Sequence, residues 1–213
     1  MTRILHDQQR TILGSLVLIT LLLAPPSVRA ETFETPAGLT AQVVTGVSLA
    51  LDHETIAYDP GLRVGGTVGY ELELELPWRT TLTPQFTMAW NNWRFKSPLN
   101  EGDHSILVAM VGVAYSQYRP FRVRDVSIWT SLDFGLGSST IEYDGFLGTN
   151  PMTESHSGLA FRFQAGTAYH LHPALALGLY LDITNVGLDE VTDLNFSAAS
   201  FDAGLVIRGR FPL

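Results

Sequence analysis

The hydrophobic residues of this chain recur at every second position over long stretches. Residues 174–183 read Ala-Leu-Ala-Leu-Gly-Leu-Tyr-Leu-Asp-Ile, with large aliphatic side chains on one phase and small or polar residues on the other. Successive residues of a β-strand point to opposite faces of a sheet, whereas a helix would spread this pattern around its axis. The segment therefore predicts a strand with one strongly apolar face.

Eight segments follow this period of two, and we expect each to form a strand. They are residues 39–51, 62–76, 80–95, 105–115, 126–138, 159–171, 174–183 and 197–211. Two features are ambiguous. The fourth segment is apolar on both phases, so its pattern does not tell which face is which, and Trp129 falls on the polar phase of the fifth segment.

The connections between these segments alternate in character. Those over residues 52–61, 96–103, 143–157 and 187–196 are longer and acidic, whereas 76–80 and 171–174 are tight turns and 117–125 carries three arginines. In an up-and-down barrel every second connection lies at the same end. We therefore expect an all-β fold, an eight-stranded antiparallel up-and-down transmembrane β-barrel, with the acidic loops at one end and both chain ends at the other.

The first 30 residues have the features of a secretory signal peptide. Arg3 and Arg10 precede an uncharged apolar run over residues 12–24, and a small-residue cleavage site ends at Ala30. The run is shorter than the roughly 20 residues that a transmembrane helix needs. The prediction is a leader over residues 1–30 and one barrel domain over residues 31–213.

Composition indicates that the outer face of the barrel does not lie in water. Without the leader the chain has 10 basic and 20 acidic residues, of which only Lys96 is a lysine, and it has no cysteine. Soluble β-proteins normally carry lysine on their outer faces and strand edges. The absence of cysteine excludes disulfides and thiolate chemistry, and the acidic balance without a basic stripe argues against nucleic-acid binding.

These features resemble the small eight-stranded outer-membrane barrels, the OmpA-, OmpX- and OmpW-like group. The resemblance rests on the leader, the alternating strands, the turns and loops, and aromatic residues near strand ends such as Trp78, Tyr115, Tyr169 and Phe211. It departs at the C-terminus, where Pro212 and Leu213 follow Phe211, although such barrels typically end on an aromatic residue.

The resemblance implies a location and a set of partners. The location is the cell outer membrane, reached by export through the periplasm. The partners are outer-membrane lipid and lipopolysaccharide, the barrel-assembly machinery acts during biogenesis, and the protein is expected to be a monomer without cofactors.

The charged residues on the inward phases predict a buried polar network. Eight strands leave an interior just wide enough for side chains, and buried charges are tolerated when they are paired. The predicted members are Glu71, Glu73, Glu75, Asp133, Arg162, Asp182, Asp202, Arg208 and Arg210. A structural plug is the favoured role of this network, and an ion or proton pathway is the alternative.

Two histidine-containing segments are weaker candidates for chemistry. His170 and His172 would share one face of a continuous strand and could hold a metal, although His172 already belongs to a turn. His156, beside Glu154, Ser155 and Ser157 in the longest predicted loop, offers the groups of an acyl-transfer site. Neighbouring residues of a loop seldom hold catalytic geometry, so no catalytic residue and no metal ligand is assigned.

The predicted outer loops carry two further features. Their acidic residues could bind divalent cations that bridge lipopolysaccharide phosphates, but they match no calcium-loop spacing and are more simply a solvated surface. These residues are Asp52, Glu54, Asp59, Asp144, Glu154, Asp189, Glu190 and Asp193. The apolar segment of residues 146–148 could contact a ligand or could pack within its own loop.

The leading hypothesis is a non-enzymatic outer-membrane β-barrel that acts through its surface loops in a structural, adhesive or envelope-maintenance role. The alternatives are an outer-membrane lipid-modifying enzyme and a small-solute carrier or narrow channel of the OmpW-like type. A soluble periplasmic β-sandwich or a lipocalin-like barrel remains the second architecture, because period-two patterning alone does not tell which face of a sheet is wet.

Overall fold

Every element that the structure describes is a β-strand. The structure is a computed structural model, and it describes residues 38–51, 57–74, 80–96, 101–120, 125–143, 152–172, 174–188 and 197–212. The strands are β1 (Gly38–Ala50), β2 (Ala57–Tyr58), β3 (Gly61–Tyr70), β4 (Leu72–Leu74), β5 (Thr80–Lys96), β6 (Glu101–Pro120), β7 (Asp125–Tyr143), β8 (Met152–His172), β9 (Leu175–Leu188) and β10 (Ser197–Pro212). The leader predicted for residues 1–30 lies outside the described residues. Among the residues described, no helix is both long and apolar enough to cross a membrane.

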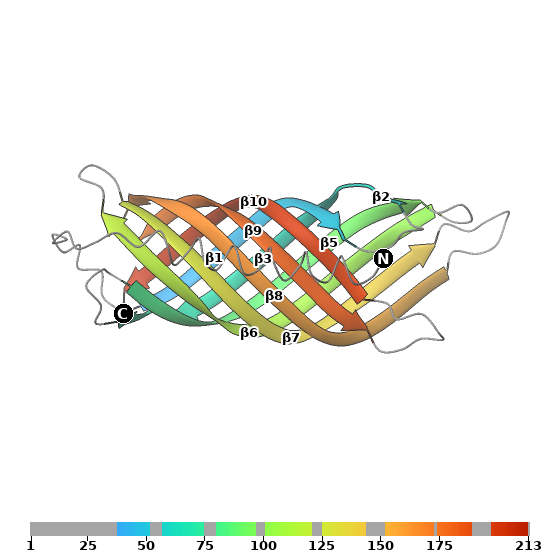
Figure 1. Ribbon diagram of the computed structural model, residues 1–213, viewed down its shortest axis with the longest axis horizontal. Coiled ribbons are helices and arrows are strands. Elements are labelled where there is room, and N and C mark those ends of the chain that lie inside the picture. The colour runs from blue at the N-terminus through green and yellow to red at the C-terminus, as the bar shows by residue number, and fades with distance from the viewer. Residues whose placement is uncertain are drawn as a thin grey trace, which may run out of the picture. The chain divides into compact units, whose positions relative to one another are not determined.

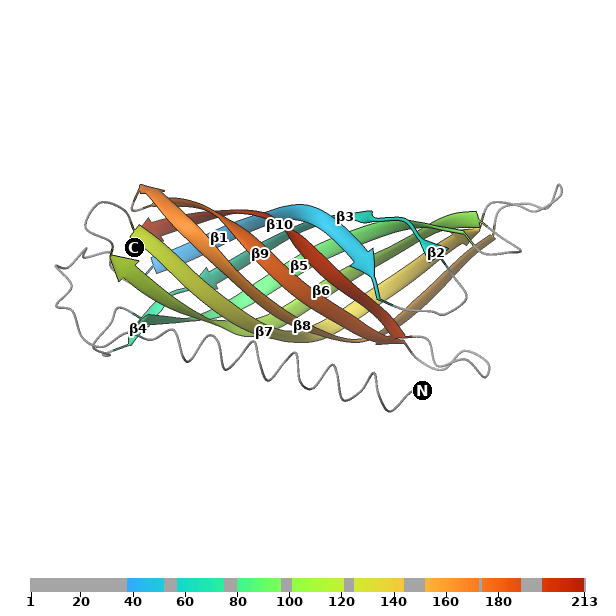
Figure 2. The same cartoon turned by 45° about the horizontal axis from the view of Figure 1, so that its top comes forward.

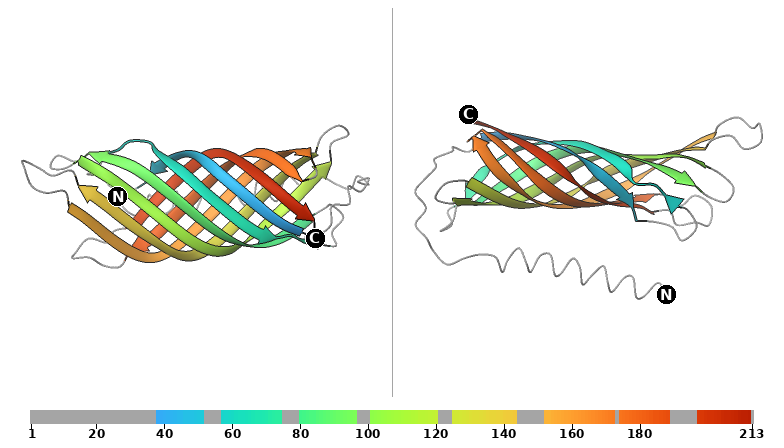
Figure 3. Two further views of the ribbon diagram at one scale, coloured as in Figure 1. Left: turned by 180° about the vertical axis from the view of Figure 1, so that it is seen from behind. Right: turned by 90° about the horizontal axis from the view of Figure 1, so that it is seen from above.

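The strands form one closed antiparallel barrel (Figure 1). β2, β3 and β4 all pair with β5, so together they supply one of the eight barrel strands. The barrel closes where β1 pairs with β10, in a register that runs from Gly38 opposite Pro212 to Ala50 opposite Ser200. The first and last strands lie side by side in the view from behind (Figure 3). The predicted fold class, an eight-stranded antiparallel up-and-down barrel, is confirmed.

The alternation of side chains separates an apolar exterior from a packed interior. On β9, Leu179 is 59% exposed whereas Ala176 on the opposite phase is 1% exposed. The exposures also show which phase of the fourth predicted strand faces outward. On β6, Leu107 and Val111 point outward and Val108 is buried inside the barrel. The exposed leucines and valines of neighbouring strands together form an apolar surface around the barrel, whose tilted strands are shown in Figure 2.

Several strands extend beyond the segments that periodicity predicts. β7 continues to Tyr143 and β8 begins at Met152, so part of the longest predicted loop is strand. The outward phase of β7 changes there from Leu136 to Ser138 and Glu142. The missed strand ends carry mainly polar residues on both phases, because they lie past the apolar surface. They therefore lack the regular alternation that marks a half-buried strand.

Trp129 lies inside the barrel because a glycine gives it room. It is 3% exposed and pairs with Gly166 on β8. A Cβ atom at Gly166 would lie 2.4 Å from Cζ2 of Trp129, so any larger residue would collide with the indole ring. The tryptophan on the polar phase is therefore an interior packing residue whose space is provided by its cross-strand neighbour.

Candidate functional site

The inward side chains form four successive layers along the barrel. β10 passes through all of them: Ala198 belongs to an outer apolar layer, Asp202 to a central polar network, Val206 to an inner apolar layer, and Arg208 and Arg210 to a second polar cluster. The last cluster lies at the end where the short turns connect the strands, here called the turn end. The other end, where the longer acidic connections lie, is called the loop end.

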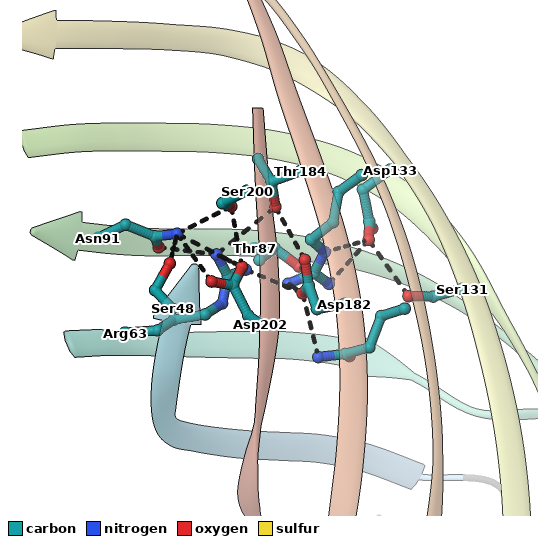
Figure 4. A network of polar contacts seen from close by, with 12 residues as sticks. Ser48, Arg63, Thr87, Asn91, Ser131, Asp133, Asp182, Thr184, Ser200 and Asp202 are labelled. Atoms are coloured by element: carbon teal, nitrogen blue, oxygen red, sulfur yellow. Dashed lines mark hydrogen bonds and ion pairs between the residues drawn. The ribbon is translucent and has the colours of Figure 1, made fainter. Parts of the chain in front are cut away.

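Arg63 on β3 holds one half of the central network (Figure 4). Its Nη2 atom donates to Oδ2 of Asp182 at 2.9 Å, and its Nη1 atom lies 2.9 Å from Oδ2 of Asp202. Nη1 also donates to Oδ1 of Asn91 at 2.8 Å. All three charged side chains have zero exposed surface, so Arg63 joins four barrel strands from a position without water contact.

Arg162 on β8 holds the other half of the central network. Its Nε and Nη2 atoms donate to Oδ2 of Asp133 at 2.9 and 2.7 Å. Its Nη1 atom lies 3.7 Å from Oδ2 of Asp182, so Asp182 lies between the two guanidinium groups. Charge-assisted hydrogen bonds of this kind are about twice as strong as neutral ones.

Neutral side chains complete the hydrogen bonds of the carboxylates. Gln85 donates to Asp133 at 2.8 Å and the Thr184 hydroxyl donates to Asp182 at 2.8 Å. The Ser200 hydroxyl donates to Asp202 at 3.0 Å, and the Asn91 amide lies 3.1 Å from the other oxygen of the same carboxylate. Each carboxylate therefore has partners on both of its oxygen atoms.

At the turn end, Glu71 accepts from two arginines. Nη2 of Arg208 lies 3.0 Å from Oε1, and Nη2 of Arg210 lies 2.5 Å from Oε2. The Tyr118 hydroxyl donates to Oε1 at 2.7 Å and also contacts Arg210. These side chains are 3% to 9% exposed, so this cluster reaches the barrel mouth more closely than the central network does.

Two apolar layers separate the central network from both ends of the barrel. The layer toward the loop end consists of Ala89, Trp93, Ile106, Val108, Met110, Ala160, Val186 and Ala198. The layer toward the turn end consists of Val44, Trp129, Ala168, Ala176, Tyr180 and Val206. Apolar side chains therefore lie on both sides of the central network within the described part of the interior.

The structure brings most of the predicted network residues into these two clusters. Asp133, Arg162, Asp182 and Asp202 meet in the central network, and Glu71, Arg208 and Arg210 meet at the turn end. Glu73 differs from the prediction, because its side chain is exposed on the short strand β4 at the rim of the barrel, beyond the buried Glu71. Glu75 lies outside the described residues.

Sequence reasoning left out three residues that organise the clusters. Arg63, Asn91 and Tyr118 are buried and contact the charged groups directly. Arg63 lies on the inward phase of the second predicted strand, next to the glutamates of that phase, so the same rule would have included it. Asn91 and Tyr118 carry no charge and lie near strand ends, where the pattern is weakest.

The structure does not assemble the acyl-transfer site considered around His156. These residues lie on β8 rather than in a loop, and the alternation of the strand turns Ser155 and Ser157 to the face opposite His156 and Glu154. His156 and Glu154 approach no closer than 4.0 Å. Glu154 instead hydrogen-bonds Tyr143; burial raises the pKa of the Tyr143 phenol and the Glu154 carboxylate raises it further.

The two histidines near the end of β8 have different partners. Nε2 of His170 lies 3.0 Å from the Ser127 hydroxyl, and Nδ1 of His172 accepts from the Ala174 amide at 3.1 Å. The pairing of β8 with β9 shifts register between His170 and His172, so the two rings do not share one face. Within the described ranges, no three histidine, aspartate or glutamate side chains are placed to hold a metal ion.

Most residues of the predicted acidic loops lie outside the described residues, as does the apolar segment of residues 146–148. Asp59 and Glu154 are described, and both are exposed. Asp59 follows β2, and its amide donates to the carbonyl of Arg94 at 2.9 Å. These two carboxylates therefore lie at the loop end of the barrel.

Comparison with known proteins identifies the fold. No protein-family model and no curated protein sequence matches this chain. The crystal structure of Neisserial surface protein A matches with a TM-score of 0.51 at 13% identity, over 83% of this chain and 100% of that chain.

Two further solved structures are more distant. Ail, the attachment invasion locus protein of Yersinia pestis, in complex with the heparin analogue sucrose octasulfate, has a TM-score of 0.47 at 15% identity over 82% of this chain and 99% of its own. The N-terminal β-barrel domain of Pseudomonas aeruginosa OprF has a TM-score of 0.35 at 11% identity over 83% of this chain and 100% of that domain. The closed eight-stranded barrel with an apolar exterior, and the match to the neisserial protein, give this chain the fold of the small outer-membrane β-barrels.

Proposed function

We propose that this protein is a non-enzymatic anchor in the cell outer membrane, which holds acidic surface loops on a closed and non-conducting barrel. The observation that carries the proposal is the filled interior. A central network of buried ion pairs lies between two apolar layers that contain Trp93 and Trp129. A lumen packed in this way provides rigidity rather than passage, which fits the small interior of an eight-stranded barrel.

The exterior supports the membrane part of the proposal. Lipid offers no hydrogen bonds, so strands cross it only as closed barrels with every backbone group paired. Side chains such as Val111, Leu136 and Leu179 are 59% to 66% exposed on the outer surface, where water would be an unfavourable contact. Outer-membrane lipid and lipopolysaccharide are the proposed neighbours, the barrel-assembly machinery the proposed route of insertion, and the monomer the proposed state.

We propose the loop end as the surface through which the protein contacts its partners. The connections over residues 52–61, 97–100, 144–151 and 189–196 contain seven acidic residues and neither lysine nor arginine. Such a surface would repel other anions and favour cationic partners or divalent cations. This charge fits a structural, adhesive or envelope-maintenance role through contacts at the cell surface.

Four measurements test the proposal. The mature protein should fractionate with outer membranes, should migrate differently on gels with and without heating, and should give no stable conductance in planar lipid bilayers. Cells whose barrel carries neutralised loops, with Asp and Glu of residues 189–193 changed to Asn and Gln, should lose surface binding of cationic probes. A water-soluble monomer or a reproducible single-channel current would contradict the proposed anchor.

A further inference from the structure

Among the residues that the structure describes, the central network has one more negative than positive charge. Three carboxylates, Asp133, Asp182 and Asp202, contact two guanidinium groups, Arg63 and Arg162. None of these five side chains is more than 1% exposed. A buried charge without a counter-charge is strongly destabilising. The network therefore needs one further unit of positive charge.

The cluster at the turn end does not supply that charge. Its two guanidinium groups, Arg208 and Arg210, both contact Glu71. Six residues of β10 separate Asp202 from Arg208, which corresponds to about 20 Å of strand. Coulomb attraction falls with distance, so over this span it is about seven times weaker than in a contact of 3 Å. The inner apolar layer with Trp129 and Val206 lies between the two clusters.

Asp202 has the weakest contact with the available positive charge. Asp133 accepts two hydrogen bonds from Arg162, and Asp182 lies between both guanidinium groups. Of the positive groups in the described network, Asp202 contacts only Nη1 of Arg63, and that same atom also donates to Asn91. The excess negative charge of the network is therefore located at Asp202.

An unpartnered hydroxyl lies on the neighbouring strand β9, where Tyr180 pairs with Gly204, two residues from Asp202. Tyr180 is 2% exposed, and its Oη atom has no hydrogen-bond partner within the described part of the chain. It lies within electrostatic range of Arg63, Arg162, Asp182 and Asp202. A phenol oxygen can accept a hydrogen bond, and oxygen atoms are the ligands that hard cations prefer.

We infer that the central network takes up one monovalent positive charge at Asp202, either a proton or a small alkali cation such as Na⁺, and is charge-balanced only with it. The charged and titratable groups around this position are Arg63 on β3, Asp182 and Tyr180 on β9, and the more distant Arg162 on β8. The neutral groups are Asn91, Ser48 and Ser200. The inference concerns the charge state of the interior and does not depend on the role of the surface loops.

The test compares three substitutions that each remove one negative charge with little change in shape. The full mature protein and its Asp133→Asn, Asp182→Asn and Asp202→Asn variants are folded in lipid vesicles and unfolded with urea. Folded fractions are followed from pH 5 to pH 9, in NaCl and in choline chloride at equal ionic strength. Asp202→Asn should be at least as stable as the wild type, whereas the other two variants should unfold at lower urea concentrations.

The pH and salt dependence of wild-type stability distinguishes a bound proton from a bound alkali cation. With a proton, the wild-type unfolding constant should rise by up to about tenfold per pH unit in both salts, because the folded state then binds one proton that the unfolded state lacks. With an alkali cation, the wild type should instead be more stable in NaCl than in choline chloride. Both dependences should disappear in Asp202→Asn. The inference is overturned if Asp202→Asn is as damaging as Asp182→Asn, or if wild-type stability responds to neither pH nor Na⁺.

Discussion

Arg63 and Asp182 form an ion pair of 2.9 Å across the barrel interior, although they lie 119 residues apart in sequence. Their strands, β3 and β9, are separated in the sheet by β1 and β10. The contact therefore joins opposite parts of the wall rather than neighbouring strands. Because the same guanidinium also contacts Asp202, it ties the N-terminal part of the barrel to both of its last strands.

Replacing Arg63 by methionine should be strongly destabilising. The change leaves Asp182 and Asp202 without their shared cation in a site that excludes water, and removing one partner of a buried ion pair costs about 3–5 kcal/mol. Urea unfolding in lipid vesicles measures the loss. The matched control is Lys96→Met on β5, where the lysine is exposed and the expected change is below about 1 kcal/mol. Equal stability of the two variants would show that Arg63 does not hold the barrel together.

Apart from Arg63, the charged members of the two clusters were predicted from the sequence, because strand alternation assigns each residue to a face. It did not predict how those residues divide into two clusters, since that depends on which strands face each other across the lumen. Glu73 shows the limit of the rule: it is two residues from the buried Glu71, yet it lies at the rim and is exposed. Periodicity gives the face of a strand but not the depth along the barrel.

Two glycine positions of the barrel wall, Gly166 beside the buried Trp129 and the exposed Gly187, should differ sharply in their tolerance of a methyl group. A Cβ atom at Gly166 would lie 2.4 Å from Trp129 and 2.6 Å from the carbonyl oxygen of Leu179. At Gly187 the nearest atom is the carbonyl oxygen of Leu159, at 3.9 Å. Gly166→Ala should therefore cost about 1–3 kcal/mol of folding free energy, whereas Gly187→Ala should be nearly neutral. The fluorescence of Trp129 should shift in the first variant alone, and a Gly166→Ala protein with wild-type stability would contradict the packing described for the indole.

Strand limits were harder to predict than strand faces. The fold follows from the apolar phase, which is strong wherever a strand borders hydrocarbon, as at Leu136 on β7. Past that level both phases are polar, as in residues 153–157 of β8, although the backbone pairing continues without interruption. The alternation of apolar and polar residues reflects the contrast between the lipid outside the barrel and the packed interior. Beyond the lipid that contrast is absent, so the alternation no longer marks the strand.

The outward face of β9 offers a direct test of that boundary. Leu179 and Asn185 point outward from the same strand, and both are exposed, but Leu179 lies among apolar neighbours and Asn185 lies near the loop end. An arginine at the middle of the lipid-facing surface costs about 2–4 kcal/mol, and one near the interface about 0–1 kcal/mol. Leu179→Arg should therefore be much less stable than Asn185→Arg when both are folded into vesicles. Similar losses for the two variants would place the lipid boundary elsewhere on β9.

The two glutamates at the turn end should respond differently to neutralisation. Glu71 is 2% exposed and is the shared acceptor of Arg208 and Arg210, so Glu71→Gln removes the buried carboxylate that both guanidinium groups contact. We expect a loss of about 3–5 kcal/mol, since breaking a buried pair leaves uncompensated charge. Glu73→Gln makes the same chemical change at an exposed position on β4 and should cost below about 1 kcal/mol. Urea unfolding of both variants in vesicles measures the difference, and the turn-end cluster would have no stabilising role if Glu71→Gln unfolded at the wild-type midpoint.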